Sequence, residues 1–130
     1  LEQVTVWTDQ KWLVYVLDQL ILNAIKYRSK TPTLTFSVAT EPGVVHLTVK
    51  DNGCGIKAEE IPRIFHKGFT GTNGRTETYK STGMGLYFSK RILDRLGHQI
   101  VVKSEVFKST EIILSFYQLS DYANLTKVSH

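Results

Sequence analysis

Apolar residues recur with helical spacing near the start of the chain. They come in pairs that repeat every four positions between residues 12 and 25, at Trp12, Leu13, Val16, Leu17, Leu20, Ile21, Ala24 and Ile25. This stripe predicts an amphipathic helix whose apolar face lies in the core. Thr8 or Asp9 precedes the stripe and is the expected N-cap.

Strict alternation of apolar and polar residues replaces this period further along. Two alternating runs flank the turn sequence Glu41-Pro42-Gly43 and predict a β-hairpin. Their apolar positions are Leu34, Phe36 and Val38 in the first run and Val45, Leu47 and Val49 in the second. Alternation also predicts a short strand at Val4 and Val6, and a pair of strands near the end. That pair carries Ile100 and Val102 in one strand and Ile112, Leu114 and Phe116 in the other.

A second helix is predicted from about Gly83 to Leu96, and Gly97 supplies its C-terminal stop. The apolar face of this helix carries Phe88, Ile92, Leu93 and Leu96. Before it, residues 68–81 are polar, contain glycine and follow no period. Because this stretch is longer than most structural connections, we expect it to form a mobile lid.

These elements predict an α/β (α+β) two-layer sandwich, in which a mixed, mostly antiparallel sheet packs on helices. The 130 residues fit one domain. We expect this domain to span residues 1–119, followed by a loose tail at 120–130 that has little apolar content. The hydrophobic share of 42% and the charged share of 22% are near globular averages, which excludes a disordered or fibrous chain.

Composition also narrows the setting and the partners. No apolar run approaches the roughly 20 residues that cross a bilayer, and the N-terminus lacks the regions of a signal peptide, so we expect a soluble fragment. The single cysteine, Cys54, excludes an internal disulfide and favours a reducing cytosolic setting. The formal net charge of +4 is compatible with nucleic acid, acidic lipid or phosphate ligands. Basic residues are scattered without interleaved aromatics, so we expect no nucleic-acid partner.

A polar edge runs along the first predicted helix. Gln19, Asn23 and Lys26 fall at i, i+4 and i+7, which lines two amides and a cation beside the apolar stripe. Such an edge is either part of a site or an ordinary solvated flank, and the spacing alone leaves both interpretations open.

Two glycine-containing segments accompany this edge. In DNGCGI, residues 51–56, Asp51 precedes Gly53 and Gly55, which permit positive φ and let another group approach the backbone. A tight turn is the alternative. STGMGL, residues 81–86, opens the second predicted helix, where free N–H groups and the helix dipole attract phosphate. It lacks the Gly-Lys-Ser/Thr of a P-loop, and the antiparallel strand order disfavours a dinucleotide fingerprint.

Taken together, these segments resemble the ATP-binding catalytic domain of bacterial sensor histidine kinases, in the GHKL superfamily shared with gyrase, mismatch-repair and chaperone ATPases. LDQLILNAIKY is similar to the N box, DNGCGI to the first glycine box, RIFHKGFTG to the phenylalanine box and STGMGLYFSKRI to the second glycine box, in the family's order and spacing. The resemblance covers about residues 5–117. Its subtype is most similar to the BceS-like kinases that partner antimicrobial-peptide transporters in Gram-positive bacteria.

The resemblance implies a Bergerat-type ATP-binding fold with ATP and Mg²⁺ as cofactors. The implied reaction transfers the γ-phosphoryl group to a histidine on a separate dimerisation domain, for relay to a response regulator. The full-length protein would be a membrane-bound homodimer with this domain on the cytoplasmic side. None of the chain's own histidines matches the acceptor; these are His46, His66, His98 and His130.

The resemblance also assigns roles to individual residues. Asp51 would accept a hydrogen bond from the exocyclic amine of adenine, and Asn23 would ligate Mg²⁺. The implied catalytic residues are Asn23, Lys26 and Lys67. Of these, Lys26 and Lys67 would face the phosphates, and His66 is a further candidate beside Lys67. A solvated loop cation is an equally fair interpretation of Lys67. The full set of implied cofactor-binding residues is Asn23, Lys26, Tyr27, Asp51, Gly53, Gly55, Ile56, Phe69, Thr82, Gly83, Met84, Gly85, Leu86 and Thr110. Within it Tyr27 would lie against the adenosine, and Ile56 and Leu86 would be apolar walls or ordinary core residues.

Three positions depart from the family pattern. Gln19 stands where the superfamily's water-activating ATPases carry Glu, and an amide is not a general base, so we expect slow hydrolysis. Ser81 replaces the first glycine of the second glycine box, and the usual glycine before Thr110 is missing. Two alternatives to a histidine kinase stay open: a nucleotide-binding sensor or pseudokinase, and a hydrolysing ATPase of the GHKL type.

Overall fold

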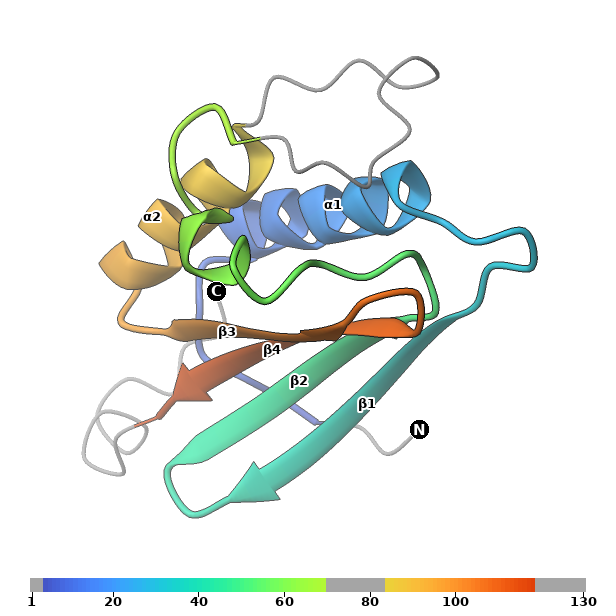
Figure 1. The fold of residues 1–130 in the computed structure, drawn as a ribbon. Coiled ribbons are helices and arrows are strands. Elements are labelled where there is room, and N and C mark those ends of the chain that lie inside the picture. Colours follow the sequence, from blue (N-terminus) through green and yellow to red (C-terminus); the bar gives the residue numbers. More distant parts are fainter. Residues whose placement is uncertain (1–3, 70–83, 119–130) are drawn as a thin grey trace.

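The computed structural model describes residues 4–69 and 84–118, which form helices packed on one face of an antiparallel sheet (Figure 1). The elements are α1 (Gln10–Lys26), β1 (Leu34–Glu41), β2 (Val44–Asp51), the 3₁₀ helix η1 (Ile61–Arg63), α2 (Gly85–Arg95), β3 (Gln99–Glu105) and β4 (Ser109–Tyr117). The strand order is β1-β2-β4-β3, and each neighbouring pair is antiparallel. The predicted two-layer α/β sandwich is confirmed. We expected a mixed, mostly antiparallel sheet, but the sheet of the described residues contains no parallel pair.

Helix α1 follows from its sequence signals. The Asp9 side chain accepts a hydrogen bond from the Trp12 backbone N–H at 3.2 Å, so Asp9 rather than Thr8 is the N-cap. Val16 and Leu20 are fully buried, as the apolar stripe predicts. The helix runs to Lys26, one residue beyond the stripe, and this brings the polar edge to the C-terminal end of α1.

The short strand expected at Val4 and Val6 is wrong: residues 4–9 form no strand. The backbone groups of this segment have another partner. The Trp7 N–H donates to Gln118 Oε1 at 2.7 Å, and Gln118 Nε2 donates to the Trp7 carbonyl at 3.3 Å. A side-chain amide thus takes the place of a neighbouring strand, which alternation alone does not reveal.

The core lies between the helices and the sheet. The sheet contributes residues at alternate positions on its helix-facing side. The buried apolar cluster consists of Val16, Leu20, Val49, Leu93, Ile100, Ile112, Leu114 and Phe116. Seven of these eight residues are apolar positions that the periodicity singled out on the first helix, the hairpin and the last strand pair, and Leu93 lies on the predicted apolar face of the second helix. The core positions predicted on these elements are therefore confirmed, except on β1, whose apolar residues are exposed.

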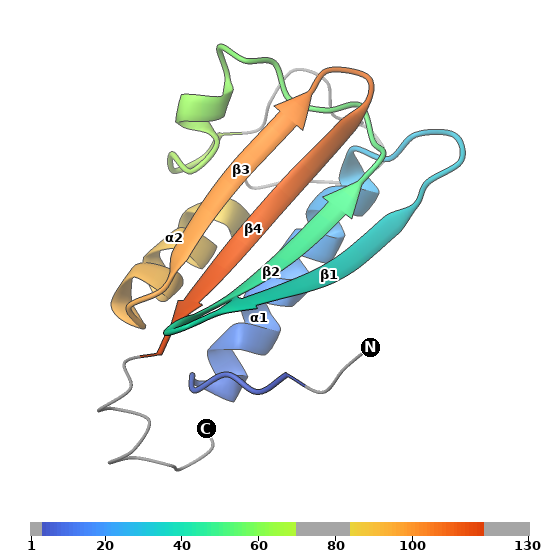
Figure 2. The same ribbon diagram turned by 90° about the horizontal axis from the view of Figure 1, so that it is seen from below.

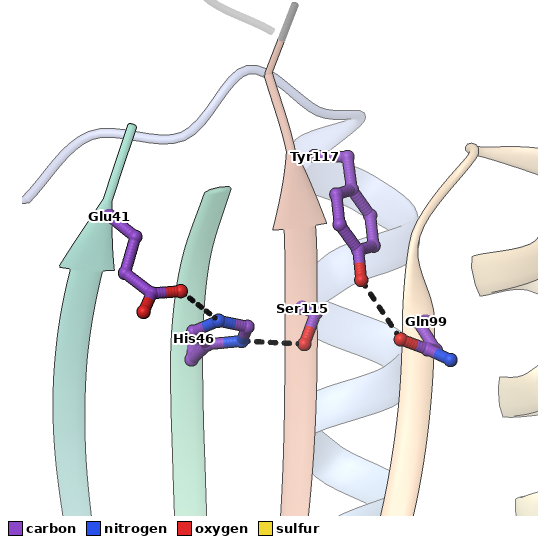
Figure 3. Close-up of polar contacts among 5 residues, drawn as sticks. All are labelled: Glu41, His46, Gln99, Ser115 and Tyr117. Atoms are coloured by element: carbon purple, nitrogen blue, oxygen red, sulfur yellow. Dashed lines mark hydrogen bonds and ion pairs between the residues drawn. The ribbon is translucent and has the colours of Figure 1, made fainter. Parts of the chain in front are cut away.

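The opposite face of the sheet, which is turned toward the viewer in Figure 2, carries polar contacts between strands (Figure 3). His46 bridges two strands, with Nδ1 2.7 Å from Ser115 Oγ and Nε2 3.2 Å from Glu41 Oε2. Tyr117 donates its hydroxyl to Gln99 Oε1 at 2.9 Å. Most residues that point to this face are polar, with exceptions such as Val101 of β3 and Ile113 of β4.

Helix α2 begins at Gly85 with Met84 at the N-cap position and ends at Arg95, close to the predicted span. Gly97 has φ of 78°, which confirms the predicted glycine stop. The predicted start at Gly83, most of the expected lid and the expected tail lie outside the described residues. In the part of the chain that the structure describes, no helix is long and apolar enough to cross a membrane.

Candidate functional site

One polar row closes the helix-facing side of the sheet at the end where β2 and β3 finish. Asp51 pairs with Thr110 across β2 and β4, and Thr110 pairs with Ser104 across β4 and β3. Each of these residues continues the inward alternation of an apolar strand, so the row lies directly beyond the buried core. Thr110 is buried at 5% exposure. Polar groups in this position are costly unless they bind one another or a ligand.

Asp51 is held in place by the glycine segment that follows it. Its Oδ1 accepts a hydrogen bond from the Gly53 N–H at 2.8 Å. Burial raises the pKa of the Asp51 carboxyl, while the Gly53 hydrogen bond acts in the opposite direction. Among the described residues, Oδ2 has no hydrogen-bond partner. A half-buried acceptor with one oxygen unused suits a ligand that brings N–H donors.

The bare backbone of DNGCGI makes room for two carbonyl groups of the protein. A Cβ on Gly53 would lie 2.3 Å from the Tyr27 carbonyl oxygen, and one on Gly55 would lie 2.4 Å from the Glu105 carbonyl oxygen. Gly55 also has φ of 73°, a conformation that favours glycine. The Cys54 N–H donates to the Tyr27 carbonyl at 2.9 Å, and the Cys54 carbonyl accepts from the Phe107 N–H at 2.7 Å. These glycines therefore let the segment pack closely against both α1 and the β3–β4 hairpin. That a purine fits beside them stays a prediction.

Asn52 has a role that the sequence patterns did not reveal. Its Oδ1 accepts from the Thr33 N–H at 2.7 Å, and its Nδ2 donates to the Thr31 carbonyl at 2.9 Å. The side chain thereby fastens the connection between α1 and β1 to the site. Asx side chains commonly bind backbone groups in turns, so the residue type was a usable signal, although it did not name the partner segment.

The polar edge of α1 ends at Lys26, and the next residue, Tyr27, connects it to the site. Lys26 is 7% exposed, and its Nζ lies 4.9 Å from the centre of the Tyr27 ring. Burial lowers the pKa of Lys26, and no ion pair to Lys26 occurs among the described residues. Burial, and then the charges of Cys54 and Glu60, raise the pKa of Tyr27 to about 12. A buried ammonium without a carboxylate is costly, and an anionic ligand would offset that cost.

Asn23 and Gln19 lie on the same edge of α1. Asn23 is half-buried, and its side chain forms no hydrogen bond within residues 4–69 and 84–118. Gln19 contacts the start of α2, because a Cβ on Gly85 would lie 2.5 Å from Gln19 Oε1. Gln19 of the N box therefore lies against Gly85 of the second glycine box.

The remaining candidates differ in exposure and in their contacts. Lys67 and His66 are exposed, and Phe69 is half-buried with its ring centre 5.5 Å from Arg63 Cζ. Leu86 packs against the buried core, which fits the core-packing alternative at that position. The backbone N–H of Ile56 donates to Ser104 Oγ at 2.8 Å. Two further candidates, Thr82 and Gly83, lie outside the described residues.

Ser104 is the site residue that sequence reasoning missed. Its hydroxyl contacts Ile56, Ser109 and Thr110. A signal was present, because Ser104 follows Ile100 and Val102 at the spacing of their strand and is a polar residue in an inward position. Asp51 and Thr110 are likewise polar residues at inward positions of their strands.

A metal ion at this site would depend on a ligand for most of its oxygen atoms. Residues 4–69 and 84–118 contain no group of three or more His, Cys, Asp or Glu side chains that could hold a metal ion. Asn23 offers one amide oxygen. Mg²⁺ usually keeps several waters and combines few protein ligands with substrate phosphates, which fits a site of this kind.

Known proteins share the sequence and the fold. Residues 8–119 match the family described as histidine kinase-, DNA gyrase B-, and HSP90-like ATPase. The sensor histidine kinase GraS of Staphylococcus haemolyticus is 38% identical over 125 residues, which cover 95% of this chain and 36% of that protein. The sensor protein BceS of Halalkalibacterium halodurans is 38% identical over 122 residues, which cover 94% and 36%. The chain thus spans about a third of the length of these curated relatives.

A solved structure agrees with this assignment at the level of the fold. The mycobacterial sensor histidine kinase MprB matches with a TM-score of 0.78 at 21% identity, over 87% of this chain and 76% of that chain. The sequence match takes in every helix and strand described above. The resemblance drawn from the four boxes is confirmed, and this chain belongs to the family of histidine kinase-, DNA gyrase B- and HSP90-like ATPases, among sensor kinases of the BceS-like type.

Proposed function

We propose that this chain is the ATP-binding catalytic domain of a two-component sensor histidine kinase. It transfers the γ-phosphoryl group of ATP to a histidine on a separate dimerisation domain, for relay to a response regulator. The matched relatives are named sensor kinases, and the four boxes of this chain follow the kinase pattern. The full-length protein is a membrane-anchored homodimer with this domain on the cytoplasmic side.

The observation that carries the proposal is the bond from the Cys54 N–H to the Tyr27 carbonyl at 2.9 Å. It joins the end of α1, with its buried Lys26 ammonium, to the segment that holds the Asp51 carboxylate. One end of the ligand must then offer N–H donors and the other end negative charge. Adenine and a triphosphate meet both requirements in one molecule.

The residues of this site fit phosphoryl transfer because that reaction asks mainly for alignment and charge neutralisation. Lys26 and, from the phenylalanine box, Lys67 supply positive charge for the phosphates. Asn23 supplies an oxygen for Mg²⁺, which screens the phosphate charge when it is bound. The chain needs no nucleophile of its own, since the acceptor histidine belongs to the dimerisation domain.

The test is a transfer assay with labelled ATP, Mg²⁺, this domain and the histidine-bearing dimerisation domain of the same kinase. Label should move to the dimerisation domain and disappear when its acceptor histidine is changed to alanine. ATP binding without transfer would instead support a nucleotide-binding sensor or pseudokinase. Rapid conversion of ATP to ADP by the domain alone would support a hydrolysing ATPase, which Gln19 argues against.

A further inference from the structure

The hydroxyl of Ser104 makes three contacts at the end of the sheet. It accepts from the Ile56 N–H at 2.8 Å, lies 2.8 Å from the Ser109 carbonyl oxygen, and lies 2.9 Å from Thr110 Oγ1. A serine hydroxyl has one proton to donate and two lone pairs to accept with. Three contacts therefore use the one proton and both lone pairs of the Ser104 hydroxyl. The donor in each hydrogen bond can then be assigned.

The proton of Ser104 has one possible destination if every contact is a hydrogen bond. A carbonyl oxygen can only accept, so the contact to Ser109 requires the Ser104 proton. The contact between Ser104 and Thr110 then requires the proton of Thr110. If Ser104 donated to Thr110 instead, two oxygens at 2.8 Å would face each other without a hydrogen, which is unfavourable.

Thr110 is thereby left with lone pairs only. Its one proton points to Ser104, and among the described residues Oγ1 has no other partner. On the neighbouring strand the paired residue is Asp51, whose carboxylate also only accepts when ionised. Thr110 and Asp51 together form an edge that offers acceptors and no donor. A water bound to both Thr110 and Asp51 would donate its two protons to them, so it would offer only lone pairs to a ligand.

We propose that Ser104 is a positioning residue for base selection: by taking the proton of Thr110, it makes Thr110 and Asp51 select a purine with an amine at position 6 against one with an oxo group. This inference rests on the proposed function, since it concerns the adenine end of the ATP site. The 6-amino group of adenine donates, whereas the oxygen at position 6 of guanine or hypoxanthine accepts. An oxo base in the same orientation places its oxygen against two acceptors.

The experiment measures the dissociation constants of ATP and of ITP, which carries hypoxanthine, by calorimetry on the wild-type domain and on Ser104→Ala. ITP should bind wild type more weakly than ATP. In Ser104→Ala the Thr110 hydroxyl is free to turn and donate to the oxo group. The ratio of the dissociation constant of ITP to that of ATP should therefore fall by about fivefold, which corresponds to one neutral hydrogen bond. Ser104→Thr keeps the hydroxyl and should keep the preference.

A double-mutant cycle shows whether Ser104 acts through Thr110. Thr110→Val should narrow the preference on its own, and adding Ser104→Ala to it should change the preference little further. A merely structural role of Ser104 would weaken both nucleotides equally, so an unchanged ratio in Ser104→Ala would overturn the proposal. If Ser104→Ala does not fold, an unchanged ratio in Thr110→Val would overturn it. Failure of wild type to bind ATP at all would instead overturn the proposed function, and the inference with it.

Discussion

The backbone of Gly53 lies directly against the carbonyl oxygen of Tyr27. A Cβ at position 53 would come within 2.3 Å of that oxygen and within 2.9 Å of Asp51 Oδ1. The neighbouring bond from the Cys54 N–H to the same carbonyl leaves this approach little room to relax. The end of α1 and the Asp51 segment are thus joined at a point where only a hydrogen atom fits.

We therefore expect Gly53→Ala to lower the free energy of unfolding by about 2 to 3 kcal/mol, as overpacking of a tight contact does. Gly97→Ala is the matched control: nothing lies within 4 Å of a Cβ there, so only the φ of 78° is unfavourable. That control should cost about 1 kcal/mol. Urea unfolding of both variants makes the comparison, and an equal loss in the two would show that the contact at Gly53 is soft.

Asp51→Asn should raise the stability of the domain near neutral pH and weaken its binding of ATP. Because burial raises the pKa of Asp51, the folded state holds its proton more tightly than the unfolded chain does. Stability from this group therefore falls as pH rises from the usual aspartate value of 3.8 through the raised pKa. Asparagine keeps the acceptor for Gly53 and carries no charge, so the variant should unfold at higher urea than wild type near neutral pH.

The same variant should bind ATP about 10 to 100 times more weakly, since it loses a hydrogen bond to a charged acceptor. Calorimetry near neutral pH measures this loss, and urea unfolding below pH 3.8 supplies the control, because there the stability gain should disappear. A variant that bound ATP normally would show that Asp51 does not contact the base.

Asn23→Ala should remove the part of ATP affinity that depends on Mg²⁺. Asn23 is half-buried on the edge of α1 that also carries Lys26, and its side chain has no hydrogen-bond partner among the described residues. Titrations with Mg²⁺ and with a chelator should therefore give the same affinity in the variant and different affinities in wild type. Asp18→Ala, an exposed change on the same helix, should keep the Mg²⁺ effect.

The elements of the fold were predictable because their apolar residues follow the period of a helix or of a strand. The stripe on α1 and the alternation of β2 placed core residues correctly, whereas the apolar residues of β1 are exposed. The segment at Val4 and Val6 failed because its partner is the side chain of Gln118, more than a hundred residues away. A tertiary contact of that kind leaves no trace in local spacing.

The site was predictable as a set of segments and not as a set of contacts. The missing side chains of Gly53 and Gly55 make room for the carbonyls of Tyr27 and Glu105, which the motif does not reveal, and space for a ligand beside them stays a prediction. Ser104 was missed because a single serine in a strand has no motif around it. Its polar side chain at an inward position was a usable signal, but only the register sets it beside Thr110.

His98 should make the domain less stable in mild acid. Its ring is buried at 7% exposure, with Nε2 3.0 Å from Thr8 Oγ1 and an edge contact to Phe116. Burial lowers the pKa of His98, so below 6.5 the unfolded chain takes up the proton first. Stability from this group is therefore present above pH 6.5 and is lost as pH falls through the lowered pKa.

The free energy of unfolding, measured in urea on both sides of pH 6.5, should fall more steeply with acid in wild type than in His98→Gln. Glutamine can still bond to Thr8 but does not titrate in this range. Equal slopes in the two proteins would mean that His98 keeps its ordinary pKa in the folded state.

Gln19→Glu should convert slow hydrolysis into measurable ATP turnover. Gln19 lies on the polar edge of α1, and its Oε1 contacts Gly85 at the start of α2, where free N–H groups attract negative charge. A carboxylate is therefore tolerated there and can accept a proton from water, which an amide cannot do. Steady-state ADP production by the domain alone should rise by about tenfold or more. Gln19→Ala removes the amide without supplying a base and should show no rise. If both variants hydrolyse ATP at the wild-type rate while still binding it, position 19 does not face the attacking water, and slow hydrolysis must have another cause.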